Sequence, residues 1–466
     1  MLKIFNTLTK KKEEFIPVEE GKAKIYVCGP TVYNFFHIGN ARPFITYDIV
    51  RKYLEFLGYD VTYVMNLTDI DDKIINRAIE EKISTEEVAE KYTAEFFKDI
   101  DELRIKRADV YPKATDHIKE MIQMVETLIE KGFAYESKGD VYFNIPQNKE
   151  YGKLSGKILE ELQASERTAT GSGKKNDLDF TLWKSAKPNE PAWESPWGKG
   201  RPGWHLECSA MSTKYLGETF DIHGGGTDLV FPHHENEIAQ SECTFGKQFV
   251  NYWMHNGMLN LNDEKMSKSL GNFFTTREVL GKFLGESVRM LMIQKHYRSP
   301  IAYSFERLEE AQSSVERITS TYKRGLEKLN GNLEGGDEVF AQRIEQFKEG
   351  MNDDFNTAKG MSIVFEAVKE VNILLSKLNL NETEKNILVG EIKFIEKTDK
   401  IFDVILKKEE EGGGKFGEVM KILIKLRKKL RAKKDWELSD YLRDELEKIN
   451  ILIQDTPNGT KWDIKK

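Results

Sequence analysis

The chain has 466 residues, which is too long for a single hydrophobic core and predicts about two to four domains. Hydrophobic residues make up 39% and charged residues 32%, as in ordinary globular proteins, and without a run of about 18 apolar residues no membrane span is predicted. The net charge of −7 excludes a globally basic nucleic-acid-binding protein, so contact with nucleic acid requires a local basic patch.

The cysteine content predicts a reducing compartment. There are three cysteines, Cys28, Cys208 and Cys243, an odd number whose first member is far from the others. That arrangement is a poor disulfide framework. The first fifteen residues lack the apolar segment of a secretory signal. We therefore expect a cytoplasmic protein with no membrane partner.

The first hundred residues predict the opening of a parallel, doubly wound α/β sheet. A strand over 22–28 is followed by a helix over 41–57 and by a second strand over 60–66. Ligands of such sheets bind at the carboxyl ends of the strands, which is where Cys28 and Thr68 fall. Both are therefore candidate site residues.

The pattern then changes in a way that indicates an inserted domain. A helix is predicted over 113–131 and a short strand over 140–144, and the polar, Gly- and Ser-rich stretch 169–176 predicts a mobile loop. We interpret 108–203 as an insertion that follows the first half of the nucleotide-binding domain, 1–107.

The second half of the chain is divided by the same reasoning. The sheet is expected to resume with a strand over 220–223, inside the second half of the catalytic domain, 204–304. Helical periodicity over 305–408 predicts a bundle. A glycine- and glutamate-rich linker over 409–415 precedes a small module over 415–466.

Four residues form a candidate metal site. His233 and Glu237 lie four apart in a segment that starts with proline and predicts a helix, so their side chains share a face. Cys28 and Cys208 add two thiolates to one imidazole and one carboxylate, all of them usual zinc donors. No spacing among them is that of a zinc finger, and from the residues alone such a set is more often unrelated than jointly bound to a metal.

Other histidines and a cysteine compete for roles near this site. His234 is an alternative ligand to its neighbour, and Cys243 is interpreted as a core cysteine. Five of the eight histidines fall within residues 205–255. Three of them are either hydrogen-bonded core residues or a shell that orients the metal ligands, namely His205, His223 and His255.

The nucleotide site is not a P-loop, because the chain has no Gly-x4-Gly-Lys-Ser/Thr. The segment from His37 through Gly39 to Asn40 precedes a predicted helix, whose N-terminal amides and dipole favour phosphate. Three glycines centred on Gly225 are either a flexible turn or a close backbone approach to a ligand. In the second case Asp228 is placed to accept a hydrogen bond from a ribose hydroxyl.

The pentapeptide that starts at Lys265 and includes Lys268 places two lysines around small polar residues. Such lysines can neutralise a polyphosphate during nucleotidyl transfer, although alone the segment would be read as a solvated turn. Together with the segment from His37 to Asn40, it resembles the class I aminoacyl-tRNA synthetases. The candidate metal ligands narrow the resemblance to the cysteinyl-tRNA synthetases, over essentially the whole chain.

The resemblance implies a Rossmann-like catalytic domain that activates L-cysteine with ATP and Mg²⁺ and transfers it to the 3′ end of tRNA(Cys). It implies a monomer with one Zn²⁺ per chain that binds the substrate thiolate. Its catalytic residues are His37, Asn40, Lys265 and Lys268, and its further ATP-binding residues are Gly39, Gly225 and Asp228. Its amino-acid-binding residues are Cys28, Gly29, Thr68, Trp204 and His233, and its metal ligands are Cys28, Cys208, His233 and Glu237. Asn40 stands where class I chains usually carry histidine.

The basic stretch 415–434 has nine basic residues and one acidic residue. A basic amphipathic helix is commonly a solvated face or a membrane-surface element. Because this stretch follows a helical bundle, it resembles instead the anticodon-binding module of the family. The stretch 351–357 within the bundle also resembles a signature of the family. The implied tRNA contacts are Arg431, Trp436, Asp440 and Asp455, with Trp436 stacking on a base.

Three alternatives remain at this point. A cysteine:amino-sugar ligase would share the activation chemistry but lack the C-terminal module. A non-catalytic tRNA-binding relative should have lost catalytic lysines or metal ligands. Another class I synthetase is disfavoured by the candidate metal ligands.

Overall fold

The structure is a computed structural model, and it describes residues 1–157, 173–188, 190–261, 264–265, 274–405, 415–433, 435–449, 451–456 and 459–464. The chain forms two compact units, Met1–Ile405 and Leu406–Lys466, which are described separately. Residues 169–172 of the predicted loop and 409–414 of the predicted linker lie outside the described residues. The finer five-part division stays a prediction.

A four-stranded parallel sheet forms the centre of the first unit, in the order β10 (Val250–Asn256), β9 (Phe220–Gly226), β3 (Lys22–Val27) and β4 (Asp60–Met65). β3 pairs on both sides, with Ile25 opposite Tyr63 and Ile222. The prediction of a parallel, doubly wound sheet is confirmed. The strand predicted over 220–223 is longer than expected, because its glycines continue the ladder opposite β10.

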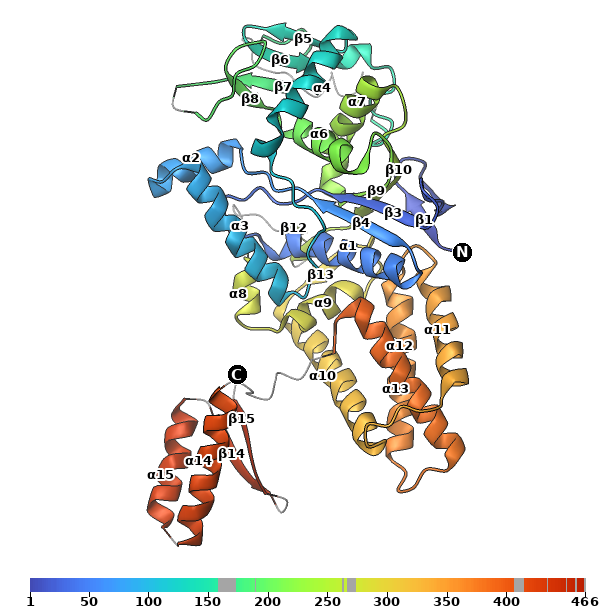
Figure 1. Ribbon diagram of the computed structural model, residues 1–466, viewed down its shortest axis with the longest axis vertical. Helices are drawn as coiled ribbons and strands as arrows, with labels where there is room; N and C mark the ends of the chain where they lie inside the picture. The colour runs from blue at the N-terminus through green and yellow to red at the C-terminus, as the bar shows by residue number, and fades with distance from the viewer. Residues whose placement is uncertain are drawn as a thin grey trace. The chain divides into compact units, whose positions relative to one another are not determined.

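Helices cover both faces of this sheet, which explains why the last three residues of β3 and of β4 are all apolar and buried. α1 (Ile38–Phe56) contacts all four strands, and α6 (Trp204–Leu216) contacts β3 and β4. Figure 1 shows the two helices on opposite sides of the sheet. The helix predicted over 41–57 is therefore present and begins three residues earlier, so that its first turn follows His37 directly.

The predicted insertion carries a four-stranded antiparallel sheet in the order β5 (Ala134–Ser137), β6 (Asp140–Phe143), β7 (Phe180–Ser185) and β8 (Gly200–Pro202). The helix predicted over 113–131 is α4 (Ile118–Glu130), preceded by a short 3-10 turn. α4 packs against α6 and α7 (Glu235–Phe245). One hydrophobic core joins this region to the parallel sheet, through buried residues such as Tyr26, Phe143 and Leu206.

Below the sheet in Figure 1, a helical bundle follows a small second sheet. The small sheet is β12 (Glu264–Lys265), β11 (Leu259–Leu261) and β13 (Ile301–Tyr303). The bundle is α10 (Phe305–Lys328), α11 (Asp337–Met351), α12 (Thr357–Leu375) and α13 (Glu382–Phe402), as the helical periodicity predicts. The remaining regular elements of this unit are β1 (Lys3–Asn6), β2 (Lys11–Glu14), α2 (Asp72–Glu81), α3 (Thr85–Glu102), α8 (Thr276–Leu280) and α9 (Gly285–Ile293).

The second unit consists of two helices and a hairpin. α14 (Lys415–Ala432) and α15 (Trp436–Lys448) precede β14 (Ile451–Thr456) and β15 (Gly459–Ile464). A small core of Met420, Leu446 and Ile451 holds them together. Among the described residues of the whole chain, no helix has the length and apolar character required to cross a membrane.

Candidate functional site

The four predicted metal ligands converge, although they come from four separate elements. Cys28 follows β3, Cys208 lies in α6, His233 lies in a short turn over Val230–His234, and Glu237 lies in α7. One donor atom from each lies within 4.8 Å of every other. Cys28 Sγ is 3.8 Å from Cys208 Sγ, and His233 Nε2 is 3.1 Å from Glu237 Oε1. The spacing of four residues does place the histidine and the glutamate side by side.

A second set of donors overlaps the first and includes the alternative ligand. Cys28, His223, His234 and Glu237 also bring one donor atom each within 4.8 Å of the others. Cys28 Sγ lies 3.4 Å from His234 Nε2. The helix predicted over 232–240 begins only at Glu235, because the preceding residues form an irregular turn. That turn is what brings two consecutive histidine rings to the same cluster.

Burial and mutual charge strongly perturb the ionisation of these groups. Burial alone would raise the pKa of Glu237, but the charges and hydrogen bonds of His223 and His233 hold it well below its usual range. Burial raises the pKa of the Cys28 thiol, whereas a hydrogen bond with Cys28 lowers the pKa of Cys208 to about 6. Glu237 and Cys208 are thus held in their charged forms, whereas Cys28 keeps a proton that a divalent cation can replace.

Two of the three further histidines lie against predicted ligands, and the third lies against the alternative ligand His234. His223 Nε2 is 2.8 Å from Glu237 Oε2, and His205 Nδ1 is 2.8 Å from His233 Nδ1. His255 bridges His234 Nδ1, at 2.7 Å, and the hydroxyl of Thr7, at 2.8 Å. Burial lowers the pKa of both His205 and His255 to about 3, so their rings are neutral near pH 7. Of the two interpretations of these histidines, this geometry favours the shell that orients metal ligands.

The predicted amino-acid-binding residues surround the cluster. The Thr68 hydroxyl donates to Glu207 Oε2 at 2.8 Å and accepts from Asn66 Nδ2 at 3.2 Å. The Gly29 amide donates to Asn66 Oδ1 at 2.8 Å, and a Cβ at Gly29 would stand 1.7 Å from a backbone oxygen. Trp204 is 44% exposed, and its ring centroid lies 4.3 Å from that of His233. Thr68, Gly29 and Trp204 are thus all within the same neighbourhood.

Glu207 is a site residue that the sequence analysis missed. Its carboxylate is 1% exposed, and burial raises its pKa well above the usual range. It precedes Cys208 in α6 and accepts the hydroxyl proton of Thr68, 139 positions away. The available signal was an acidic residue next to a predicted metal ligand in α6. The pairing itself had no sequence pattern.

The predicted phosphate-binding segment lies at the N-terminus of α1. His37 is the N-cap residue of this 19-residue helix, and the Asn40 amide donates to the His37 carbonyl at 2.8 Å. A Cβ at Gly39 would meet the His37 ring at 2.8 Å, so glycine permits this close turn. His37 forms a β-bridge with Thr275, and the Ile38 amide donates to Phe274 at 3.0 Å.

Those contacts place Phe274 and Thr275, which follow the lysine pentapeptide in the chain, at the start of α1. Lys265 ends β12, which pairs with β11, but its side chain lies outside what the structure describes. Lys268 lies wholly outside the described residues. The residues that follow the lysine segment are therefore placed beside α1, while the positions of the Lys265 and Lys268 ammonium groups stay a prediction.

The glycine run and Asp228 lie at the carboxyl end of β9. Gly225 pairs with His255 of β10, so the run is strand rather than turn. Asp228 follows in a short 3-10 turn and is exposed. A Cβ at Gly226 would stand 2.4 Å from Asp228 Oδ1, so glycine allows this carboxylate to fold against the strand. The pair occupies the edge where ligands of parallel sheets bind.

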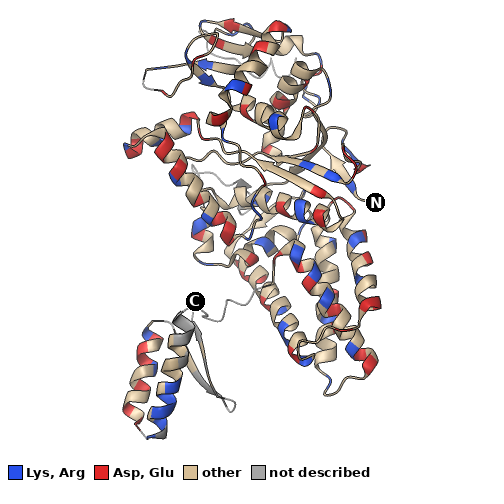
Figure 2. Cartoon of the chain, in the orientation of Figure 1, with Lys and Arg blue, Asp and Glu red and all other residues tan. Residues whose placement is uncertain are grey.

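In the second unit, the predicted tRNA contacts lie mostly on exposed surface. Trp436 is 54% exposed, and the Arg431 guanidinium lies 5.6 Å from its ring centroid. Asp440 Oδ1 is 3.6 Å from Arg443 Nη1. Figure 2 shows lysines and arginines following one another along α14. The side chain of Asp455 lies outside the described residues.

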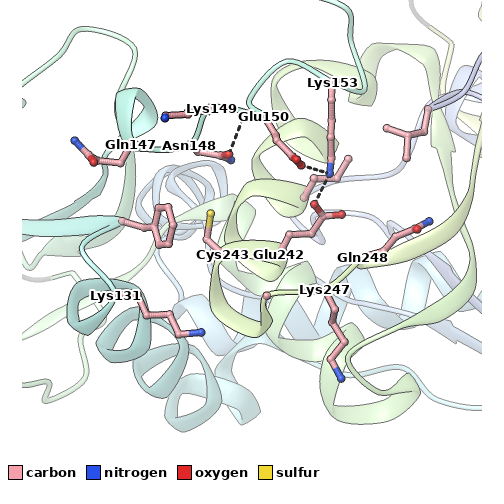
Figure 3. Close-up of a pocket in the computed structure, with 14 residues that line it drawn as sticks. Lys131, Gln147, Asn148, Lys149, Glu150, Lys153, Glu242, Cys243, Lys247 and Gln248 are labelled. Atoms are coloured by element: carbon pink, nitrogen blue, oxygen red, sulfur yellow. Dashed lines mark hydrogen bonds and ion pairs between the residues drawn. The ribbon is translucent and has the colours of Figure 1, made fainter.

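A large cavity of about 900 Å³ lies elsewhere, between the insertion and α7. Figure 3 shows Lys153 held between Glu150 and Glu242 on its wall. None of the predicted site residues lines it. Cys243, interpreted as a core cysteine, does line it while packing partly buried against the core. Burial raises the pKa of Cys243 to about 12, which makes the thiol unreactive.

Known proteins resemble this chain along its whole length. A family described as tRNA synthetases class I (C) catalytic domain matches residues 14–313, and a DALR domain matches residues 346–406. A cysteine–tRNA ligase of Carboxydothermus hydrogenoformans is 52% identical, over 99% of each chain. One of Thermococcus onnurineus is 47% identical, over 99% of this chain and 98% of the relative.

Solved structures show the same fold at much lower identity. A Mycobacterium tuberculosis methionyl-tRNA synthetase bound by methionyl-adenylate superposes with a TM-score of 0.61 at 12% identity. The match covers 82% of this chain and 92% of that one. A leucyl-tRNA synthetase of Agrobacterium radiobacter, solved in a ternary complex, gives a TM-score of 0.60 at 11% identity, over 84% of this chain and 85% of that one.

Proposed function

The chain belongs to the cysteine–tRNA ligases, a family of class I aminoacyl-tRNA synthetases, and we propose that it selects L-cysteine with one zinc ion per chain. The observation that carries the proposal is the convergence of Cys28, Cys208, His233 and Glu237 within 4.8 Å. The match to cysteine–tRNA ligases extends through the C-terminal module, which a cysteine:amino-sugar ligase would lack. This disfavours that alternative.

The donor set fits zinc and suits the substrate. Two thiolates, an imidazole and a carboxylate are the donors that zinc prefers, and in this protein all four are buried or partly buried. When bound, zinc supplies a soft positive charge that takes a thiolate far more readily than a hydroxyl. A pocket that relied on shape alone would separate cysteine from serine by only about two powers of ten. We therefore expect no editing site for serine.

The residues around the metal ligands would hold the rest of the amino acid. Thr68 is fixed by Glu207 and Asn66, so its hydroxyl is oriented before substrate arrives. We assign it to the substrate amino group. Trp204 stacks near His233 and would cover the side chain of the bound cysteine. At Gly29 a side chain would clash with the backbone of Asn66, so only glycine allows the two backbones to lie this close beside the site.

The nucleotide would bind along the edge between α1 and β9. His37 and Asn40 would donate hydrogen bonds to the phosphates at the N-terminus of α1, which also favours anions electrostatically. Gly225 and Asp228 would receive the ribose. The cysteine carboxylate attacks the α-phosphorus of ATP, the bond to the pyrophosphate oxygen breaks, and cysteinyl-adenylate and pyrophosphate form. Lys265 and Lys268, with Mg²⁺, would neutralise the charge that develops on the phosphates.

The acyl group then passes to a terminal ribose hydroxyl of tRNA(Cys), and AMP leaves. No covalent enzyme intermediate is needed, because alignment of the two reactants supplies the rate enhancement. The second unit would bind the anticodon through Arg431, Trp436, Asp440 and Asp455, with an exposed aromatic ring available for stacking. We place the protein in the cytoplasm as a monomer, consistent with its three free cysteines.

Amino-acid-dependent ATP–pyrophosphate exchange tests this proposal. Exchange should occur with cysteine and not with serine, should disappear when zinc is stripped, and should return when zinc is restored. Exchange that survives zinc removal, or that is equal with serine, would overturn the metal mechanism. Folded, zinc-loaded protein without any exchange would favour the non-catalytic tRNA-binding alternative.

A further inference from the structure

A tyrosine hydroxyl bridges two strands directly behind the predicted nucleotide site. Tyr47 lies in α1 and is fully buried. Its hydroxyl accepts a hydrogen bond from the Gly225 amide at 2.8 Å and lies 2.6 Å from the Met254 carbonyl, to which it donates. Gly225 belongs to β9 and Met254 to β10. The hydroxyl therefore fixes the two strands relative to each other at their carboxyl ends.

The glycine run is also confined by neighbouring rings. A Cβ at Gly224 would stand 2.4 Å from the ring of Tyr47. A Cβ at Gly225 would stand 2.7 Å from the ring of His234, which belongs to the metal cluster. Neither position admits a side chain without a shift of the strand or of a buried ring. The backbone at Gly225 is therefore held between Tyr47 and His234.

We infer that Tyr47 is a positioning residue for ATP, acting through the backbone of Gly225. This inference rests on the proposed function, because it assigns Gly225 to the ATP site. His37, the proposed phosphate-binding residue, is the N-cap of the same helix, so α1 carries phosphate donors at its start and supports the ribose edge nearly three turns later. Tyr47 itself touches neither substrate. It sets the distance between the two halves of the nucleotide site.

The hydroxyl contributes this support because both of its partners are buried backbone groups. Without it, the Gly225 amide would lose its hydrogen-bond partner, and the Met254 carbonyl would lose the hydroxyl that donates to it. Such groups regain partners by small movements of the backbone. A movement at the end of β9 would displace the ribose-binding edge relative to His37. Misplacement of a bound group by a fraction of an ångström is enough to weaken productive binding.

The matched control lies in the same helix. Tyr53 is also fully buried in α1, but its hydroxyl donates to Asn352 Oδ1 at 2.8 Å, at the bundle. Tyr47→Phe and Tyr53→Phe each remove one buried hydroxyl from one helix. Loss of packing or of general stability should therefore be similar in the two variants. Only Tyr47→Phe removes a contact to the nucleotide site.

The experiment measures ATP–pyrophosphate exchange with zinc-loaded, full-length protein, together with zinc content and unfolding temperature. Tyr47→Phe should raise the KM for ATP about three- to tenfold, with the KM for cysteine and the zinc content unchanged. Tyr53→Phe should leave both KM values and the zinc content as in the unaltered protein. Equal behaviour of the two variants would overturn the inference, as would a rise confined to the KM for cysteine.

If Tyr47→Phe does not fold, Gly224→Ala provides the second variant. Its methyl group would press on the Tyr47 ring, displace the hydroxyl from Gly225, and raise the KM for ATP in the same way. An unchanged KM in that variant would overturn the inference. Loss of cysteine-dependent exchange in the unaltered protein would instead overturn the proposed function, and this inference with it. If only the inference fails, the unaltered protein still shows normal cysteine-dependent exchange.

Discussion

His233 Nε2 and Glu237 Oε1 lie 3.1 Å apart, across the junction between an irregular turn and α7, and directly beside two cysteine sulfurs. His234, the next residue, instead directs Nε2 toward Cys28 at 3.4 Å and uses Nδ1 to contact His255. Two adjacent histidines thus approach one cluster from different sides. Their relative importance for zinc is the sharpest question that the geometry raises.

We predict that His233→Asn reduces the zinc bound after dialysis against a chelator to less than about a tenth of a full site, because it removes a direct ligand. His234→Asn should weaken zinc binding by about ten- to a hundredfold, as expected for a residue that orients ligands. The measurement is zinc per chain by atomic emission.

The matched control for these two variants is His117→Asn. His117 is 3% exposed and bonds the Lys113 carbonyl and the Tyr215 hydroxyl, away from the cluster. It should keep a full complement of zinc. If His233→Asn retains zinc while His234→Asn loses it, the ligand assignment is reversed.

The hydrogen bond from Thr68 to Glu207 predicts a selective effect on cysteine binding. Thr68→Val keeps the size of the side chain but removes the hydroxyl and leaves the buried Glu207 carboxylate without its donor. We expect the KM for cysteine to rise about tenfold or more, equivalent to about 1.4 kcal/mol. Thr68→Ser keeps the hydroxyl and should change the KM for cysteine by less than about threefold. Equal KM values for the two variants would refute the assignment of Thr68 to the substrate amino group.

Lys268→Ala should lower the rate of exchange about a hundred- to a thousandfold, with a smaller change in the KM for cysteine, because the charge acts on the developing phosphate charge. Lys282→Ala is the control. Lys282 lies 4.7 Å over the ring of Phe305, in the segment after the lysine pentapeptide, and should alter the rate by less than about twofold. Nearly normal exchange by the Lys268 variant would show that this lysine does not stabilise the developing phosphate charge.

We predict that the buried carboxyl group of Asp399 makes the stability of the protein depend on pH. Burial raises its pKa from 3.8 to about 6, although its Oδ1 accepts the amides of Val404 and Ile405 at 2.7 and 2.8 Å. A raised pKa in the folded state favours the protonated form. Its contribution to stability is therefore complete below about pH 4 and is lost as the pH rises through about 6.

Asp399→Asn is neutral at every pH and keeps an oxygen for both amides. At pH 7 it should unfold at a higher temperature than the unaltered protein, by the equivalent of at most about 3 kcal/mol, and the difference should vanish near pH 4. Calorimetry at the two pH values measures this. Asp337→Asn, which removes an exposed ion pair with Lys393, should shift stability by no more than about 0.5 kcal/mol at pH 7. A constant difference for Asp399→Asn across this range would argue against a raised pKa.

The amino-acid sequence by itself determined the family and the parallel sheet, and it named the four residues that the structure brings together as a candidate metal site. These follow from local patterns: strand, turn and helix around His37, helical spacing of His233 and Glu237, and strand ends that must meet at one edge. It also predicted the helical bundle and the basic helix of the second unit, because amphipathic periodicity depends only on neighbours in the chain.

Only the tertiary structure decided which side chains support these groups. Glu207 meets Thr68 across 139 positions, and Tyr47 meets Gly225 across 178. Such contacts leave no periodic signal, since they depend on how helices pack against the two faces of the sheet. The structure also continued β9 through the glycine run, because the pairing with β10 outweighs the weak strand preference of glycine. The contacts around the site thus depend on packing, whereas the candidate ligands could be named from the sequence motifs before their convergence was seen.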